Sequence, residues 1–260
     1  MKTKETQGKL WSTAPQDWAD FWEPTFIPLY KKVLNQVHLN EETVLLDAGC
    51  GSGLFLAMAS ASGAKVYGID AAPGLIELTK QRVPEATLMI EDLEDIPFSA
   101  NSFDVVTGFN SFQYAGDKLA ALQQAKFVAR AGGKIVVGIW DEPANCDSST
   151  IFATLGKLLP PPPPDAPGPF ALSAIGRIES ISKELNLAIL HKEKVFCPLL
   201  FTTKEALLKA FMSTGPAVKA SETLGVEKVK EIILKSSEPF RISDEVYFMS
   251  NYFNFFVLQK

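Results

Sequence analysis

The sequence predicts an α/β fold in which a doubly wound, mostly parallel sheet carries a ligand site. Short apolar runs alternate with segments of helical length between residues 44 and 140, which is the pattern of strands joined by crossover helices. The first run, Val44 to Leu46, leads into the glycine-rich turn Asp47-Ala48-Gly49-Cys50-Gly51-Ser52-Gly53. The second run, Lys65 to Asp70, ends in an acid. Because ligands of open α/β sheets gather at the carboxyl ends of strands, we expect the site at these two strand ends.

The glycine turn indicates which kind of ligand is bound. Glycines at 49, 51 and 53 let the backbone approach a ligand closely, and the helix predicted from Leu54 to Ser60 points its N–H groups toward it. The spacing is not the dinucleotide pattern G-x-G-x-x-G, whose third glycine would fall at Leu54, and no phosphate-binding G-x-x-x-x-G-K-[ST] loop is present. The carboxylate of Asp47 before the turn favours a ligand that carries a cationic group and no polyphosphate.

Residues 47–53 resemble the first motif of the class I S-adenosylmethionine (SAM) methyltransferases. SAM has an amino group, a sulfonium, a ribose and an adenine, but no phosphate. The resemblance covers residues 43–140 well and the remainder loosely. Within the family, the chain is similar to the methyltransferase type 11 group, which includes small-molecule methylases such as those of ubiquinone and menaquinone biosynthesis. It implies a Rossmann-like, seven-stranded, mostly parallel sheet with an antiparallel last strand and helical cap elements. It also implies SAM as cofactor, S-adenosylhomocysteine (SAH) as product, and cofactor contacts at Asp47, Ala48, Gly49, Gly51 and Gly53.

Other cofactor contacts follow from the next strand ends. Asp70 can accept hydrogen bonds from vicinal ribose hydroxyls, and Ala71 lies in the loop behind it. By the resemblance, Asp92 accepts from the adenine amino group and the Leu93 N–H meets a ring nitrogen. A strand-end Asp alone is more often a helix cap or part of a solvated turn, but here it follows a matching glycine turn.

Polar and aromatic residues follow the strand predicted from Phe103 to Phe109. Asn110 stands where the family faces SAM. Phe112, Gln113 and Tyr114 are expected on the substrate side, with Trp140 on the rim, and Trp18 is the candidate for the methionine end of SAM. The alternative for the aromatic residues is packing in the core.

The chain reads as one domain over residues 1–260. Residues 1–40 form an N-terminal helical cap, with helical pattern from Gln16 to Val37 interrupted at Pro24 and Pro28. Residues 41–140 are the SAM-binding core, and residues 141–260 hold a proline-rich and helical cap with the last two strands. Further expected elements are strands at 86–90 and 134–140, a helix at 117–130 stopped by Ala131-Gly132-Gly133, a helix at 173–186 capped by Ser173, a strand within 187–201, helices at 203–212 and 226–235, and a final strand at 245–258.

Composition excludes several classes of function. The chain of 260 residues has a net charge of −5, which gives no basic footprint for nucleic acid. The three cysteines, Cys50, Cys146 and Cys197, and the two histidines, His38 and His191, show no metal-ligand spacing. No apolar run reaches a membrane span, so we expect a cytoplasmic protein with reduced thiols and no metal.

The chemistry implied by the resemblance is in-line displacement of a methyl group, which depends on positioning. No catalytic base is assigned, since neither histidine stands near the expected site. The Asn/Asp-Pro-Pro-aromatic signature of some amino-group methylases is absent at residues 110–113. Phe112, Tyr114, Trp140, Phe152, Phe170 and the proline run at 160–164 suggest a small, apolar acceptor. The alternatives are a non-catalytic SAM or nucleoside binder of the same fold and a nicotinamide-dependent oxidoreductase, which the missing third glycine disfavours.

Overall fold

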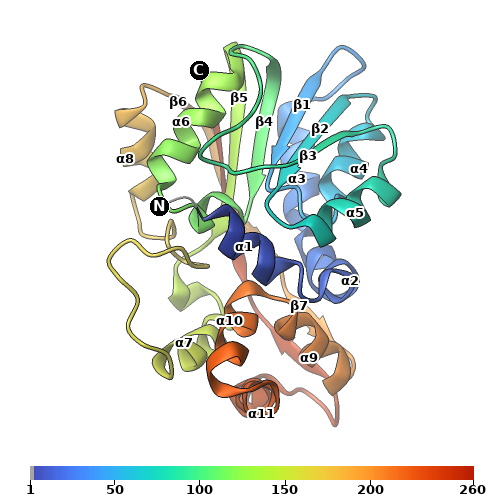
Figure 1. Cartoon of the computed structure of the whole chain (residues 1–260), viewed down its shortest axis with the longest axis vertical. Helices are drawn as coiled ribbons and strands as arrows, with labels where there is room; N and C mark the ends of the chain where they lie inside the picture. Colours follow the sequence, from blue (N-terminus) through green and yellow to red (C-terminus); the bar gives the residue numbers. More distant parts are fainter. Residues whose placement is uncertain (1–2) are drawn as a thin grey trace.

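A seven-stranded sheet in the order β3-β2-β1-β4-β5-β9-β6 forms the centre of the computed structural model, which describes residues 3–260 (Figure 1). The strands are β1 (Val44–Ala48), β2 (Lys65–Asp70), β3 (Thr87–Ile90), β4 (Phe103–Phe109), β5 (Ala129–Trp140), β6 (Ala188–Phe196) and β9 (Tyr252–Gln259). Strands β1 to β5 pair in parallel, and β9 is antiparallel to both β5 and β6. The predicted fold class, with its antiparallel last strand, is therefore confirmed.

Helices cover both faces of the sheet, so the central strands are buried on both sides. Leu45 and Val136 belong to one hydrophobic cluster, while their neighbours Leu46 and Val137 belong to the cluster on the opposite face. This explains why the strands read as nearly continuous apolar runs, since a sheet buried on both faces needs no polar alternation. The covering helices are α3 (Ile27–Val37), α4 (Leu54–Ser60), α5 (Pro73–Arg82), α6 (Lys118–Val128) and α8 (Arg177–Glu184).

The N-terminal segment is helical and broken, as the two prolines predict. It consists of α1 (Lys4–Trp11), α2 (Pro15–Asp17), the π-helical turn η1 (Trp18–Trp22), the 3₁₀ turn η2 (Glu23–Phe26) and α3. Pro24 and Pro28 each lie in the first turn of a new element, where a missing N–H costs nothing. Helix α1 lies within the helical cap expected over residues 1–40, although the helical pattern in the sequence was identified only from Gln16 onward.

A second group of elements gathers at one end of the molecule, with α1 between it and the sheet (Figure 1). These elements are α7 (Ser149–Lys157), β7 (Leu199–Phe201), α9 (Lys204–Met212), α10 (Gly215–Leu224), α11 (Val226–Ser237), the 3₁₀ turn η5 (Glu238–Phe240) and β8 (Tyr247–Met249). Two further 3₁₀ turns are η3 (Phe112–Tyr114) and η4 (Pro143–Asn145). Helix α10 was not predicted. No helix within residues 3–260 is both long enough and apolar enough to cross a membrane.

The helix expected at 117–130 is shorter than predicted. Asp117 caps α6 by accepting from the Ala120 N–H at 3.0 Å, and the helix ends at Val128. The sequence Ala131-Gly132-Gly133 does not stop it but lies within β5, where the pairing with β4 shifts between Phe103 and Val105. Gly132 has φ +76°, which is the backbone that such a bulge requires.

Two boundaries in the C-terminal half are also corrected. The helix expected from Ser173 spans only Arg177–Glu184, and Ser173 does not cap it, because its hydroxyl donates to the Trp140 carbonyl at 2.8 Å. In place of the single final strand expected at residues 245–258, the chain forms two strands, β8 and β9. They are separated where the buried side chain of Asn251 turns away to accept from the Ser148 N–H at 3.1 Å and hydroxyl at 2.7 Å.

Candidate functional site

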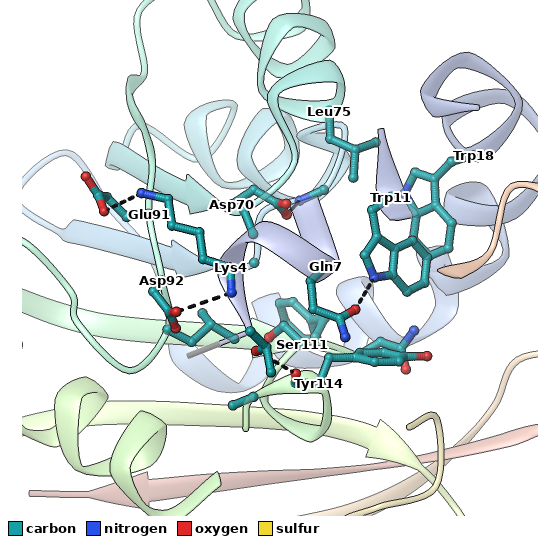
Figure 2. A pocket seen from close by; sticks show the side chains of 18 residues that line it. Lys4, Gln7, Trp11, Trp18, Asp70, Leu75, Glu91, Asp92, Ser111 and Tyr114 are labelled. Carbon is teal, nitrogen blue, oxygen red and sulfur yellow. Dashed lines mark hydrogen bonds and ion pairs between the residues drawn. The ribbon is translucent and has the colours of Figure 1, made fainter. Parts of the chain in front are cut away.

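A pocket lies at the carboxyl ends of β1, β2 and β4, beneath α1. It contains about 650 Å³ not occupied by protein atoms, part of it open to solvent. Figure 2 shows Glu91, Asp92 and Lys4 at one end, Trp11 and Trp18 at the other, and Asp70 and Gln7 between them. The lining residues are Thr3, Lys4, Gln7, Trp11, Trp18, Gly49, Gly51, Asp70, Ala71, Leu75, Glu91, Asp92, Leu93, Phe109, Asn110, Ser111, Tyr114 and Ala115.

The glycine turn forms part of the pocket wall, and its conformation requires glycine. Gly49 and Gly51 have φ of +84° and +57°, in the left-handed region that side chains disfavour. A Cβ at Gly49 would lie 2.3 Å from the Ser111 Cβ, and one at Gly51 would lie 2.9 Å from Glu23 Oε1. Of the predicted turn residues, these two line the pocket. Asp47, Ala48 and Gly53 lie behind the wall, and Gly53 packs on Thr79 of α5.

Asp70 joins the second strand end to the glycine turn. Its carboxylate accepts from the Gly51 N–H and from the Ala72 N–H, each at 2.9 Å. Burial raises the pKa of Asp70 to about 6, against the lowering effect of these two bonds. Each carboxylate oxygen can accept more than one hydrogen bond, so the pocket side of Asp70 can still accept from a ligand.

The end of the pocket beyond β3 is acidic. Asp92 and Leu93, which the resemblance assigns to adenine, both line the pocket, as does Glu91. Ala71, which follows Asp70 in the chain, lines it too. Asp92 accepts from the Glu94 N–H at 2.9 Å and from the Lys4 N–H at 3.3 Å. The contact from Lys4 ties α1 to the residue that was expected to meet adenine.

Asp47 is a buried acid behind the glycine turn. Thr107 donates to Asp47 Oδ1 at 2.6 Å. Burial raises the pKa of Asp47 to about 8, and the charges of Glu23 and Asp70 add to this rise. This carboxyl therefore favours its protonated form far more than an exposed aspartate does.

Glu23 holds the glycine turn from its far side, and sequence reasoning did not find it. Its side chain is 2% exposed. It accepts from the Ser52 N–H at 3.1 Å and from Arg82 Nη1 at 2.7 Å, and it pairs with the Ser52 hydroxyl. Burial raises the pKa of Glu23, while Ser52 and Arg82 lower it. No local sequence pattern predicts the role of this glutamate, because its partners lie 29 and 59 residues away in the chain.

Glu23→Ala should lower the free energy of unfolding by about 2 kcal/mol, because it strands the Ser52 N–H and removes the partner of Arg82. Glu23→Gln should cost less, about 1 kcal/mol, because its amide oxygen can still accept from Ser52. Urea denaturation of the two variants measures the difference. Equal losses in both would contradict a role for this acceptor oxygen.

Aromatic side chains form the other end of the pocket. The Trp11 ring meets the rings of Trp18 and Tyr114 edge-on, with centroids 4.9 and 5.3 Å apart. Trp18 is 7% exposed, and its Nε1 is buried without a hydrogen-bond partner, next to Gly51. An indole N–H rarely stays unpaired when buried. The buried Trp22 Nε1 is unpaired as well, but of the two only Trp18 lines the pocket, where its donor can meet a ligand.

Only one of the four predicted substrate-side residues lines the pocket, namely Tyr114. Phe112 is fully buried on the other face, against Gly108. Gln113 is buried and bonds to the Asn110 side chain and to the Pro169 carbonyl. The rings of Trp140 and Phe253 pack together at 4.3 Å in the core. Asn110, with φ +51°, also lines the pocket. The apolar rim expected from the aromatic residues does not form at this pocket, because most of their rings pack in the core.

No group of metal ligands stands in the part of the chain that the structure describes. No cluster of three His, Cys, Asp or Glu side chains able to hold an ion occurs between residues 3 and 260. The three cysteines are buried free thiols. His191 pairs with Glu193 at 3.2 Å, and neither histidine lines the pocket.

Comparison with known families matches the segment that builds the pocket. The profile of the family described as "Methyltransferase domain" matches residues 46–137. The chain is 35% identical over 92 residues to a malonyl-[acyl-carrier protein] O-methyltransferase of Serratia marcescens, covering 35% of this chain and 36% of that protein. It is 37% identical over 99 residues to the aklanonic acid methyltransferase DauC of Streptomyces sp. (strain C5), covering 35% and 45%. It thus covers less than half the length of these curated relatives.

Solved structures with low sequence identity share the fold over most of the chain. The YcgJ protein of Bacillus subtilis superposes with a TM-score of 0.60 at 15% identity, covering 89% of this chain and 97% of that one. A structure described as a putative methyltransferase of Bacillus halodurans gives a TM-score of 0.61 at 14% identity, covering 89% and 98%. These likenesses establish the architecture around the pocket.

Proposed function

We propose that this chain transfers a methyl group from SAM to a small acceptor, because residues 46–137 match the family described as "Methyltransferase domain" and the glycine turn at residues 47–53 resembles that of the class I SAM-dependent methyltransferases. The observation that carries the proposal is the order of groups along the pocket. Glu91 and Asp92 stand at one end, Asp70 stands in the middle, and Trp18 stands at the other (Figure 2). Gly51 of the glycine turn lies beside both Asp70 and Trp18. Adenine, ribose and the methionine part follow one another in the same order in SAM.

The residues present fit this cofactor. Asp70 retains acceptor capacity for the ribose hydroxyls, and Asp92 with the Leu93 N–H offers an acceptor and a donor for an adenine edge. The unpartnered Trp18 Nε1–H offers a donor beside the glycine turn. Asp47, Ala48 and Gly53 then act by shaping the turn from behind, while Gly49, Gly51, Ala71 and Asn110 provide the surface in contact.

The bound cofactor supplies a methyl group on a sulfonium sulfur, which is open to in-line displacement. The chain then has three tasks: to orient the cofactor through Asp70 and Asp92, to exclude water with the rings of Trp11, Trp18 and Tyr114, and to favour the cation through nearby acids. No histidine lines the pocket, which favours an acceptor atom that needs no strong base.

The acceptor is proposed to be small and mainly apolar, held against the aromatic end of the pocket. Trp11, Trp18 and Tyr114 supply the surface for it. The relatives include a malonyl-[acyl-carrier protein] O-methyltransferase, an aklanonic acid methyltransferase and a ubiquinone biosynthesis O-methyltransferase. These names agree with an acceptor that is a small molecule or a carried group.

Calorimetry with SAM, SAH and NAD tests the proposal. We expect SAM and SAH to bind and NAD not to bind, because nothing in the glycine turn matches the pyrophosphate pattern. Incubation with SAM and a panel of phenols, carboxylic acids and amines, followed by mass spectrometry, should show SAH formed in step with a methylated product. Binding of SAM with no product from any acceptor would favour the alternative, a non-catalytic SAM binder.

SAH affinity should rise between pH 5 and pH 7, because Asp70 has a pKa of about 6 and its ionised form is the better hydrogen-bond acceptor. Loss of this acceptor below pH 6 should weaken binding about tenfold by pH 5. Asp70→Asn removes the titration and should flatten the profile. Calorimetry across this pH range measures it, and a variant that keeps the wild-type slope would remove Asp70 from the explanation.

A further inference from the structure

Two buried polar groups outside the cofactor pocket have no hydrogen-bond partner. Gln113 and Trp22 are each 1% exposed, and among the residues that the structure describes, Gln113 Oε1 and Trp22 Nε1 are buried and unpaired. The amide of Gln113 has a fixed orientation, because its Nε2 donates to the Asn110 side chain and to the Pro169 carbonyl, which can only accept. Unpaired buried groups destabilise a fold and are rare, so this acceptor and this donor point to a ligand.

Each of the two groups lies directly behind a residue that lines the cofactor pocket. Asn110 and Trp18 belong to the pocket wall. Gln113 is bonded to Asn110, and the Trp22 ring stacks on that of Trp18, with centroids 6.3 Å apart and planes at 24°. A single side chain therefore separates each unpaired group from the bound cofactor.

Aromatic rings that are absent from the pocket wall connect the two groups. The aromatic shell consists of four rings from distant parts of the chain, Trp22, Trp140, Phe152 and Phe170. The Trp140 centroid lies 6.4 Å from that of Trp22 and 5.7 Å from that of Phe170, and Phe170 follows the Pro169 carbonyl that holds Gln113. These separations fall in the upper half of the range for ring contacts, about 4.5–7 Å. Because Phe152 and Phe170 are only partly buried, the shell can part on that side around a flat molecule.

We propose that the aromatic shell holds the body of the methyl acceptor, and that Gln113 and Trp22 are specificity-determining residues for it. The acceptor is then a flat molecule with a hydroxyl or amino group that donates to Gln113 Oε1 and an oxygen that accepts from Trp22 Nε1. A phenol meets both demands with one hydroxyl group. The acceptor is uncharged, because a charge among these rings would lose its water without gaining a partner. The inference rests on the proposed function, since it takes SAM as the neighbouring cofactor.

Calorimetry on the full chain saturated with SAH tests the proposal with two flat probes, 2-naphthol and naphthalene, which differ only in the hydroxyl group. We expect 2-naphthol to bind about tenfold more tightly, which is the effect of one or two neutral hydrogen bonds in a buried site. Equal affinities for the two probes, or failure of both to bind, would overturn the proposal.

Gln113→Met keeps the length of the side chain and removes its acceptor oxygen. It should reduce the preference for 2-naphthol over naphthalene to about twofold or less. If Gln113 served only to fasten Pro169 to Asn110, the variant would weaken both probes alike, and the proposal would fail. The matched control is Gln123→Met at an exposed position of α6, which should keep the wild-type preference.

The indole N–H of Trp22 gives a second readout in proton–nitrogen correlation spectra of the SAH complex. Its resonance, identified by its absence in Trp22→Phe, should lie further downfield with 2-naphthol than with naphthalene, because a hydrogen bond deshields the proton while both ring systems exert a similar ring current. The same position with both probes would contradict the role of Trp22. Absence of SAH binding to the wild-type protein would instead defeat the proposed function, so the two failures are distinguishable.

Discussion

Asp70→Ala should weaken the binding of SAM and SAH by at least 100-fold. The substitution removes the acceptor for two ribose hydroxyls, and a hydrogen bond to a charged group contributes about 1.5–3 kcal/mol. Two such bonds correspond to at least about 3 kcal/mol, or a factor of more than 100 in affinity. It also frees the Gly51 and Ala72 N–H groups that Asp70 holds at 2.9 Å. Calorimetry with SAH measures the loss.

The matched control for Asp70 is Glu77→Ala, which removes a carboxylate from the exposed face of α5. It should leave SAH affinity within about twofold of wild type, because surface charges contribute little at this distance. Circular dichroism should show that Asp70→Ala keeps the fold, since both strands around it are packed by other contacts. Wild-type affinity in a folded Asp70→Ala protein would refute the ribose assignment.

Asp47→Asn should stabilise the ligand-free protein, by an amount that grows with pH. The folded pKa of Asp47, about 8, lies above its unfolded value of about 3.9. Below pH 4 the carboxyl is neutral in both the folded and the unfolded state, so it does not lower the stability of the folded protein. As pH rises toward 8 the unfolded chain ionises first, and stability is lost at up to about 1.4 kcal/mol per pH unit. An asparagine, which cannot ionise and can still accept from Thr107, escapes this loss.

We therefore expect Asp47→Asn to raise the free energy of unfolding by about 5 kcal/mol at pH 8 and by about 1 kcal/mol at pH 4.5. Urea denaturation at the two pH values measures the increments. Asp244→Asn, at an exposed position, should change stability by less than about 0.5 kcal/mol at either pH. If the free energies of unfolding of Asp47→Asn and wild type changed with pH in parallel, Asp47 would already be ionised in the folded state.

Prediction from sequence succeeded where the pattern is local and strong. Strands 65–70 and 103–109 and helix 54–60 have the predicted bounds, because apolar runs flanked by glycine or by acids leave few alternatives. The bulge in β5 was misread as a helix stop, since Gly-Gly favours both. Ser173 was misread as a cap because a serine in front of a helical pattern gives no sign that its hydroxyl will reach Trp140.

The candidate site was predictable only in part, for a similar reason. Asp70, Asp92, Leu93 and Asn110 stand at the ends of strands, so their place follows from the topology. The direction of an aromatic ring does not follow from it. Phe112 and Tyr114 are two residues apart, yet one packs into the core and the other lines the pocket.

The sequence by itself determined the sheet, the glycine turn and the acids that end its strands, because these depend on periodicity and on backbone angles that few residues allow. The tertiary structure alone decided that Glu23 accepts hydrogen bonds from the turn, that Asp47 is buried with a raised pKa, and that α1 lies over the pocket. Each of those features joins residues that are distant in the sequence, and the free energy of such contacts depends on packing and on the loss of water in the folded protein. No local pattern encodes such contacts, which is why they appear only when the chain is folded.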